Sequence, residues 1–432
     1  MTDKPGPFSL PLYQQVVLGV AAGVLLGALF GQAPYLGGLR NDHLGRLGLW
    51  VVMALKTLAI PLVFFAILDS FIRASFPLRQ GAKLIVICLI NVTVAMAIGL
   101  AIMNGWQPGA QWYGHIDELL HLVPGSKPAG ADRPATLQID VEHPLETLAR
   151  YIPQTLGNPF SSNNIIGVVV LALVLGALLR WGQYKSGHAG GAVDRIAWGI
   201  EQGYRLLLKV LGWIILAVPF AVFGVVAQVV GTVGVGAFSV LWIFLAAMLL
   251  GLAVHAFIYY PAVAWLIGKK SPRIYVGQGA DAIMTAMSCN SSLATVPVTL
   301  RCLDRMDVSP ESARLAACVG TNLNNDGVTL YEAMAALFLA QALGFELSMG
   351  SQLSVVVASI IAGAGVAGIP EAGMIVLPLV LSAAGLPESV ILAAIPLIMT
   401  VDWILARARS GVNVMSDMLV AILLDAGRTR TG

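Results

Sequence analysis

A cluster of charged and amide side chains interrupts a long apolar run near the C-terminus, between Val401 and Asp417. In a helix, successive residues turn by about 100°, which gathers most of these polar side chains into one narrow stripe. The stripe contains Asp402, Ala406, Arg409, Ser410, Asn413 and Asp417. Charges at membrane depth are costly and usually face a bundle interior or a water-filled path. The stripe therefore predicts an ion or solute route, with a structural buried ion pair as the alternative.

The composition is that of a membrane protein. Of the 432 residues, 57% are apolar and 11% are charged, about half the charged fraction of a soluble protein. The mean hydropathy is +0.82. Long apolar windows recur along the whole chain, which predicts an all-α polytopic membrane protein surrounded by lipid bilayer. We expect no removable signal peptide and no nucleic acid partner. The four cysteines show no CxxC pairing, so we interpret them as packing thiols.

The first six spans are expected at 12–31, 46–72, 83–104, 160–181, 200–230 and 238–267. Basic connections follow spans two, four and six, whereas the long polar segment 106–145 is acidic on balance. The positive-inside rule therefore predicts a cytoplasmic N-terminus. Four further apolar stretches follow, at 275–301, 312–344, 352–384 and 388–425. If the first and third are re-entrant hairpins, the chain has eight transmembrane helices and two cytoplasmic termini.

Both of these stretches are broken in the middle, one by Ser288 to Pro297 and the other by Gly363 to Gly373. Paired interrupted segments are typical of transporter sites built from half-helices. Half-helix N-termini carry unpaired N–H groups that favour anions. Ser291 and Ser292 add hydroxyl groups at the first tip, and the glycines at the second tip let backbone approach a ligand.

A third interruption, Gly320 to Val328, contains three asparagines and Asp326. These are poor interior helix residues, so local unwinding is expected. Freed carbonyls with Asp and Asn side chains form an all-oxygen cluster suited to a hard cation, and the absence of His and Cys disfavours zinc or iron. The alternative is a purely structural cluster of polar side chains that hydrogen-bond between helices.

The order of these motifs resembles the dicarboxylate/amino-acid:cation symporter family, which includes the glutamate transporters. The matching segments are LKTLAIPLVFFAIL, SSLATVPVT, NNDGVTLYEA, GVAGIPEAG and VDWILARARSGVNVMSD. The resemblance implies a homotrimer with an elevator mechanism. Residues 1–267 would contain scaffold helices one, two, four and five and the mobile helices three and six. Residues 268–432 would form the core of the transport domain.

The resemblance also assigns roles by position. Sodium ions would be held by Asn324, Asn413, Asp417 and the Gly320 carbonyl, and a second ion by Asp326 and Asn91. Substrate contacts are expected from the first tip, the seventh span, the second tip and the eighth helix: Ser291, Ser292, Val328, Ile369, Gly373, Ala406, Arg409, Ser410 and Asn413.

Several positions depart from the family pattern. Ala406 stands where amino-acid members carry an aspartate that holds the substrate's amino group, and a buried ammonium without that partner would be expensive. Val328 replaces a threonine, Asn325 a methionine and Val92 a serine. Arg409 is retained, and its guanidinium matches a carboxylate bidentately.

These residues predict cation-coupled uptake of a small organic anion, most simply a C4-type dicarboxylate. The alternative is an acidic or neutral amino acid, whose ammonium would find acceptors at Ser410 and the hairpin carbonyls. Asp326, Asp417 and the asparagines favour sodium over protons, and no other cofactor is expected. A channel is a more distant alternative, and no protease or hydrolase motif predicts an enzyme. We expect a multi-pass protein of the inner (plasma) membrane. Arg407 is expected to pair within the bundle or snorkel, Asp402 to support the site, and Glu371 to be solvated.

Overall fold

The computed structural model describes residues 12–73, 78–113, 155–161, 165–186, 191–235, 237–345, 347–365 and 372–426. Throughout these residues the regular structure is helical, without a strand, which confirms the predicted all-α fold. Most of the polar segment 106–145 and the tip of the second hairpin, including Ile369 and Glu371, lie outside the described residues.

The first half contains the six expected spans. They are α1 (Leu12–Phe30), α2 (Asn41–Arg73), α3 (Leu78–Trp106), α7 (Ile165–Ser186), α8 (Ala192–Val233) and α9 (Ala237–Val254), which continues through a π-helical turn (His255–Tyr259) into α10 (Tyr260–Leu266). Short elements precede α2, follow α3 and precede α7: Leu36–Gly38, Pro108–Trp112 and α6 (Asn158–Ser161).

The second half follows the predicted sequence of broken and continuous helices. It contains α11 (Pro272–Cys289), α12 (Ser292–Arg305), α13 (Pro310–Arg314), a π-helical turn (Leu315–Val319), a 3-10 turn (Gly320–Asn322), α14 (Asp326–Ala342), α15 (Met349–Gly365), α16 (Ala372–Ala383) and α17 (Glu388–Ala426). The two predicted hairpins are thus α11–α12 and α15–α16. The predicted seventh span is the segment from α13 to α14.

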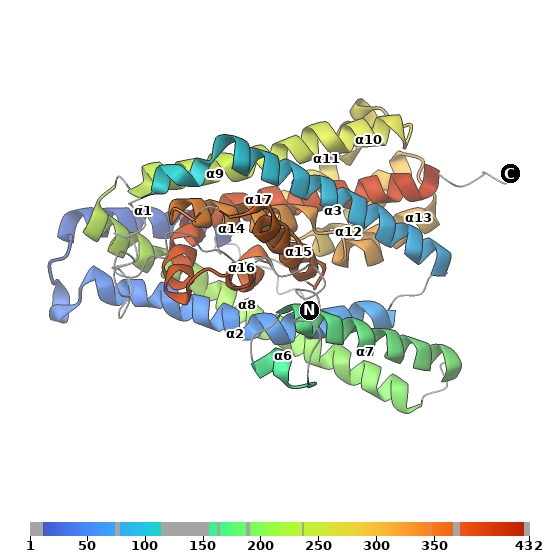
Figure 1. The fold of residues 1–432 in the computed structure, drawn as a ribbon, viewed down its shortest axis with the longest axis horizontal. Helices are drawn as coiled ribbons and strands as arrows, with labels where there is room; N and C mark the ends of the chain where they lie inside the picture. Colours follow the sequence, from blue (N-terminus) through green and yellow to red (C-terminus); the bar gives the residue numbers. More distant parts are fainter. Residues whose placement is uncertain are drawn as a thin grey trace, which may run out of the picture.

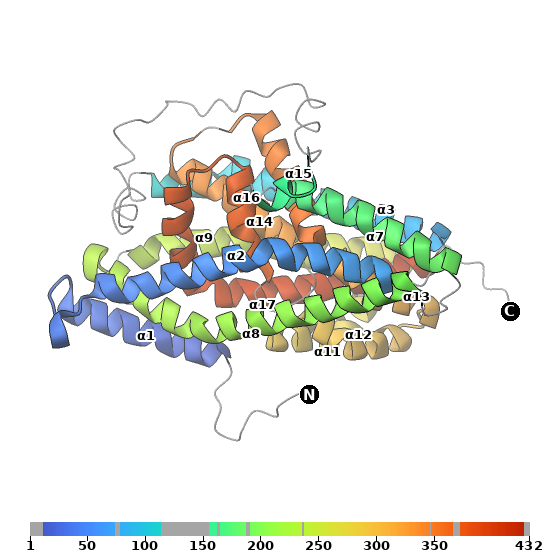
Figure 2. The ribbon, with the colours of Figure 1, turned by 90° about the horizontal axis from the view of Figure 1, so that it is seen from below.

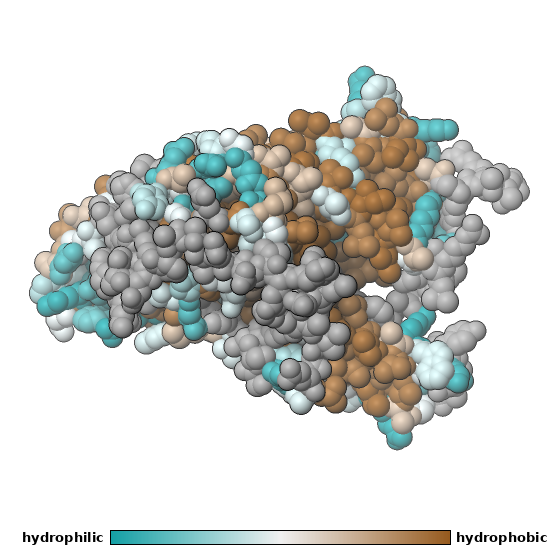
Figure 3. Space-filling model, in the orientation of Figure 1, coloured by the Kyte–Doolittle hydropathy of each residue, from teal (hydrophilic) through white to brown (hydrophobic). Residues whose placement is uncertain are grey.

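Within the described part of the chain, five helices are long and apolar enough to cross a membrane. They lie at Asn41–Asp69, Gln80–Trp106, Ala192–Thr232, Leu241–Leu266 and Glu388–Ala426. Shorter apolar helical stretches include Gln14–Phe30 and Gly167–Gln183, which belong to the other two expected spans of the first half. Figure 3 shows apolar side chains covering a broad area of one face, with hydrophilic residues gathered beyond its edges.

One boundary was predicted wrongly. The fifth span was expected at 200–230, after a basic connection, yet α8 begins at Ala192, has 42 residues and includes Arg195. A helix of that length extends over roughly 60 Å, about twice the hydrocarbon thickness of a bilayer. Its basic first turns therefore project beyond the apolar layer while remaining helical, because Lys and Arg are good helix formers.

The helices α1, α2, α7 and α8 form one packed group, in which α8 packs extensively on α1 and α2 and α7 packs mainly on α2. Small residues allow the backbones of α1 and α8 to touch. A Cβ atom on Gly19 would lie 2.7 Å from the Pro219 carbonyl oxygen, and one on Gly23 would lie 2.7 Å from the Phe223 carbonyl oxygen. Such spacing of small residues is how membrane helices approach closely. Figure 2 shows α1, α2 and α8 running side by side.

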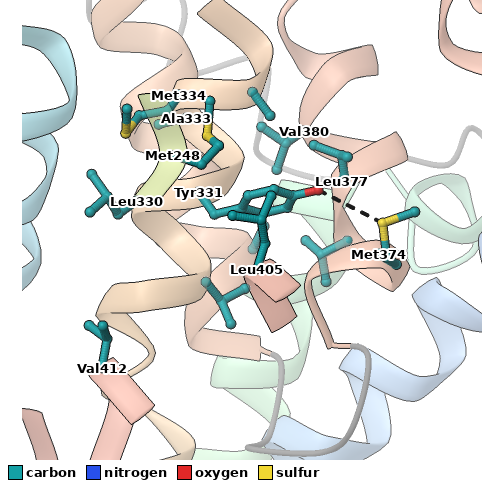
Figure 4. Packing of buried hydrophobic residues seen from close by; sticks show 14 of the residues in the cluster. Met248, Leu330, Tyr331, Ala333, Met334, Met374, Leu377, Val380, Leu405 and Val412 are labelled. Carbon is teal, nitrogen blue, oxygen red and sulfur yellow. Dashed lines mark hydrogen bonds between the residues drawn. The ribbon is translucent and has the colours of Figure 1, made fainter. Parts of the chain in front are cut away.

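The remaining helices surround α17, which contacts α11, α12, α14 and α16 and runs through the middle of the bundle (Figure 1). Tyr331 of α14 is 1% exposed and lies among Leu377, Val380 and Leu405 (Figure 4). Its hydroxyl donates to the sulfur of Met374 across 3.8 Å. This packing fixes α14, α16 and α17 relative to one another, and these helices carry most of the predicted site residues.

Candidate functional site

The first hairpin reverses direction at Asn290, whose φ of 51° lies in the left-handed region that asparagine tolerates. The side chain of Ser291 then caps α12 by accepting from the Ala294 N–H at 3.1 Å. The next hydroxyl, that of Ser292, accepts from Thr321 at 3.2 Å. Asn290 itself accepts a hydrogen bond from Ser410 of α17 at 2.9 Å. The predicted interruption is confirmed, and its tip lies against the polar stripe of α17.

The chain also breaks where the Asn/Asp motif predicted, between Gly320 and Asp326. The Gly320 carbonyl accepts from the N–H groups of Leu323 at 2.7 Å and Asn324 at 2.8 Å. Asn325 is the N-cap of α14, but its side chain does not cap that helix. Asn413 of α17 does so instead, because its Oδ1 accepts the Gly327 N–H at 2.9 Å. The start of α14 and the middle of α17 are therefore joined directly.

Arg409, which was predicted to contact the substrate, is 2% exposed. Its Nη1 and Nη2 donate to the two carboxylate oxygens of Asp402 at 2.7 and 3.0 Å. The guanidinium also lies 4.0 Å from the ring centre of Tyr331, in cation–π geometry. Gly373 of α16 approaches so closely that a Cβ atom there would lie 2.8 Å from the Arg409 Cζ. Asp402 was expected to support the site, and the structure shows that it binds Arg409 directly.

Two other positions predicted to contact the substrate, Ala406 and Val328, are buried and apolar. Val328 follows Gly327, where a Cβ atom would lie 2.8 Å from the Arg409 carbonyl oxygen. Arg407 donates to the Trp403 carbonyl of its own helix at 2.8 Å. Arg407 was expected to pair within the bundle or snorkel, and this contact lies within its own helix.

Asp417 occupies the other end of the stripe. Its Oδ1 accepts from the Asn324 amide at 3.3 Å, and both residues are at least 98% buried. The Oδ1 of Asn324 has no hydrogen-bond partner within the described residues. A buried amide oxygen and a nearby buried carboxylate are oxygen ligands that suit a hard cation such as sodium.

Asp326 and Asn91 bind two adjacent tyrosines at the end of the π-helical turn. Asp326 Oδ2 accepts from Tyr260 at 2.9 Å and Ser416 at 2.6 Å, and it lies 3.5 Å from His255 Nε2. Asn91 Oδ1 accepts from Tyr259 at 2.9 Å. Within the described residues, Asp326 Oδ1 and Asn91 Nδ2 have no hydrogen-bond partner. The carboxylate oxygen fits a second cation, whereas Asn91 has its oxygen engaged by Tyr259.

Sequence reasoning missed several residues of this region. His255, Tyr260 and Ser416 contact Asp326, Tyr331 stacks on Arg409, and Thr321 binds Ser292. Glu332 is fully buried, and neither carboxylate oxygen has a hydrogen-bond partner within the described residues. A signal existed for Glu332, since an acidic residue in an apolar span is a site candidate by itself. The others are single polar residues without a distinctive spacing.

The structure therefore brings Arg409, Ser410, Asn413 and Asp417 together along α17, and Asn324 joins them through its hydrogen bond to Asp417. Ser291 and Ser292 join them through the first hairpin, and Gly373 through α16. Asp326 reaches α17 through Ser416, while Asn91 reaches this region through Tyr259 of the π-helical turn. Ile369 lies outside the described residues.

Comparisons with known proteins show the family of this chain. Excitatory amino acid transporter 1 of Bos taurus and of Homo sapiens are each 32% identical over 292 residues, covering 66% of this chain and 52% of the relative. The aligned part thus spans about half the length of these relatives. Excitatory amino acid transporter 3 of Mus musculus is 26% identical over 450 residues, covering 94% of this chain and 83% of the relative. The profile of the sodium:dicarboxylate symporter family matches residues 12–426, and the chain belongs to that family.

Proposed function

We propose that this chain is a sodium-coupled symporter for a small acidic solute. The main observation behind this proposal is that one buried helix, α17, has a cationic group and an acidic group at separate positions. Arg409 provides a fixed cation for a solute carboxylate, and Asp417 with Asn324 provides oxygens for a coupling cation. Membership of the sodium:dicarboxylate symporter family also supports sodium-coupled symport.

The solute we propose first is an acidic amino acid. The relatives named above are excitatory amino acid transporters, and they favour this alternative over the dicarboxylate that the sequence suggested. The structure offers acceptors for an ammonium group. Ser410 gives its proton to Asn290, so the lone pairs of its Oγ remain available to a donor.

A C4-type dicarboxylate is the second candidate, and one observation favours it. Ala406 is 2% exposed and apolar at the position where the family resemblance places an ammonium-binding acid. A solute with two carboxylates and no ammonium would leave no buried positive charge without an acidic partner.

Uptake into proteoliposomes tests the proposal. Labelled aspartate, glutamate, succinate and malate are offered under inward sodium, proton and potassium gradients. We expect accumulation of aspartate or glutamate with sodium alone, and collapse of that accumulation when a sodium ionophore is added. Succinate uptake well above aspartate uptake would establish the second candidate. The absence of gradient-driven uptake of all four solutes would contradict symport of acidic solutes.

We further propose a homotrimeric elevator with cytoplasmic termini and sodium at both acidic positions. The family resemblance supports the trimer. The packing of α8 with α1 and α2 is far more extensive than the contacts of these three helices with α17, which supports a scaffold and a transport domain. Cross-linking in membranes is expected to give a trimer band. A tag at either terminus is expected to be protected from protease in right-side-out vesicles and cleaved in inverted ones.

A further inference from the structure

Asn290, at the tip of the first hairpin, has a backbone conformation that few residue types tolerate. It follows the last residue of α11, and its φ of 51° and ψ of 40° lie in the left-handed region. Asparagine and glycine occupy this region more readily than most other residues. Asn290 is 7% exposed, and the next residue, Ser291, caps α12. The tight turn and the helix that starts after it therefore hold the Asn290 side chain in a defined position.

The side chain of Asn290 sets the direction of the Ser410 hydroxyl proton. Its Oδ1 accepts a hydrogen bond from the Ser410 Oγ, on α17, at 2.9 Å. A serine hydroxyl has a single proton and two lone pairs. Because that proton is directed at Asn290, Ser410 can only accept a hydrogen bond from a further partner. Asn290 thus decides which kind of hydrogen bond Ser410 offers.

The other side chains of this part of the stripe are less suited to accept from an ammonium group. The carboxylate of Asp402 accepts twice from Arg409, which balances its charge. Ala406 has no polar side-chain atom, and the Oδ1 of Asn413 already accepts a backbone N–H of α14 at 2.9 Å. Within the described residues, no donor is directed at the Ser410 Oγ. This oxygen is therefore an available acceptor in the residue next to Arg409.

We propose that Asn290 is a positioning residue that makes the site favour solutes with an ammonium group over solutes with carboxylates alone. The inference rests on the proposed function, in which Arg409 binds a solute carboxylate and Ser410 contacts the solute. With its proton held by Asn290, Ser410 accepts from an ammonium N–H and has no proton to donate to a carboxylate. Without the Asn290 side chain, the hydroxyl can rotate and donate, so that the preference for an ammonium group is lost.

Two substitutions and a matched control isolate this role. Asn290→Gly removes the side chain and keeps the turn, because glycine adopts the left-handed conformation readily. Asn290→Asp keeps an oxygen that accepts from Ser410, and aspartate also tolerates this conformation. The control is Ser288→Ala, two residues earlier in the same hairpin. The Ser288 hydroxyl donates to the Met284 carbonyl of its own helix at 2.7 Å, so its loss should leave Ser410 unaffected.

The measurement is uptake of labelled aspartate and succinate into proteoliposomes under an inward sodium gradient. Succinate is aspartate without its amino group, so comparing the two solutes isolates the ammonium contact. We define the selectivity ratio as maximal rate divided by KM for aspartate, over the same quantity for succinate. Asn290→Gly should lower this ratio by about tenfold, the effect of one hydrogen bond to a charged group, mainly through a higher KM for aspartate. Asn290→Asp should keep the ratio at or above that of the parent, and Ser288→Ala should leave it unchanged.

A double-mutant cycle with Ser410→Ala tests whether Asn290 acts through Ser410. Ser410→Ala should lower the selectivity ratio as Asn290→Gly does, and the double variant should lower it no further. Thermal unfolding and gel filtration check the folding of each variant.

Three results would overturn the inference: an unchanged ratio in Asn290→Gly, a tenfold fall in Asn290→Asp, or an effect of Asn290→Gly that is equally large in the Ser410→Ala background. Each of these leaves the proposed function standing, because the parent still transports. If the parent accumulates none of the acidic solutes, the proposed function fails and the inference fails with it.

Discussion

Buried charge is balanced differently at the two ends of the polar stripe on α17. At one end Arg409 is neutralised by Asp402 through two hydrogen bonds and lies on Tyr331. At the other end, Asp417 accepts its hydrogen bond from the neutral amide of Asn324. Neutral donors do not cancel a carboxylate's charge, so the acidic end needs a cation from outside. An incoming carboxylate, in contrast, must compete with Asp402 for Arg409.

The largest expected effect is loss of the charge balance at the arginine end. Arg409→Met leaves the Asp402 carboxylate buried without its cation, which we expect to destabilise the protein by about 3–5 kcal/mol. The double variant Asp402→Asn with Arg409→Met is expected to recover a large part of that loss. Thermal unfolding of the wild type, both single variants and the double variant completes the cycle. Additive single losses would show that the two residues are not energetically coupled.

The acidic end is tested by Asp417→Asn, which removes a charge but keeps the shape. A hydrogen bond or contact with a charged group contributes about 1.5–3 kcal/mol, so the apparent sodium affinity should fall by about tenfold or more. The shift of the unfolding temperature with sodium measures it, with choline as the reference ion. Asp425→Asn is the matched control, because Asp425 lies near the end of the same helix and accepts from Ser309. An unchanged sodium response in Asp417→Asn would contradict the assignment of a cation to this end.

Much of this site could be predicted because polar residues in an apolar run are strong signals. Asn324, Asp326 and the first hairpin tip interrupt helices where the sequence indicated. A structural buried ion pair was the alternative interpretation of the stripe, but its partners, Asp402 and Arg409, were not identified. They are seven residues apart, so the arginine must extend along two turns to reach the acid, and a one-dimensional pattern does not show that direction.

The surroundings of Asp326 were not predictable for a different reason. Its contacts come from His255, Tyr260 and Ser416, which are far apart in the sequence and stand singly among apolar residues. The π-helical turn at His255–Tyr259 alters the helical phase, which places Tyr259 toward Asn91 and Tyr260 toward Asp326. Helical periodicity read from the sequence assumes a constant turn angle and cannot anticipate this change.

Ala406→Asp adds an acid to the arginine end of the stripe and tests whether the solute's ammonium group binds there. Ala406 lies about one turn before Arg409 on the same stripe, so a carboxylate there provides a partner for a solute ammonium. We expect the ratio of aspartate to succinate uptake to rise by about tenfold or more, since a site built to bind a polar group rejects solutes that lack it. Ala406→Asn is the uncharged control and should change the ratio less. A ratio that stays constant in both variants would mean that the ammonium binds elsewhere.

The smallest expected effect concerns the far end of α17, beyond both charged regions. Lys83 of α3 donates to the carbonyls of Leu423 and Leu424 at 3.0 and 2.9 Å, where the helix has unpaired carbonyls and a negative dipole. Lys83→Met should cost about 0.3–1 kcal/mol and lower the unfolding temperature slightly. The sodium-dependent rise in that temperature should stay unchanged, since no residue proposed to bind sodium is touched. If Lys83→Met instead weakens the sodium response as Asp417→Asn does, the response reports general stability of α17 and the contrast between its two ends loses its main support.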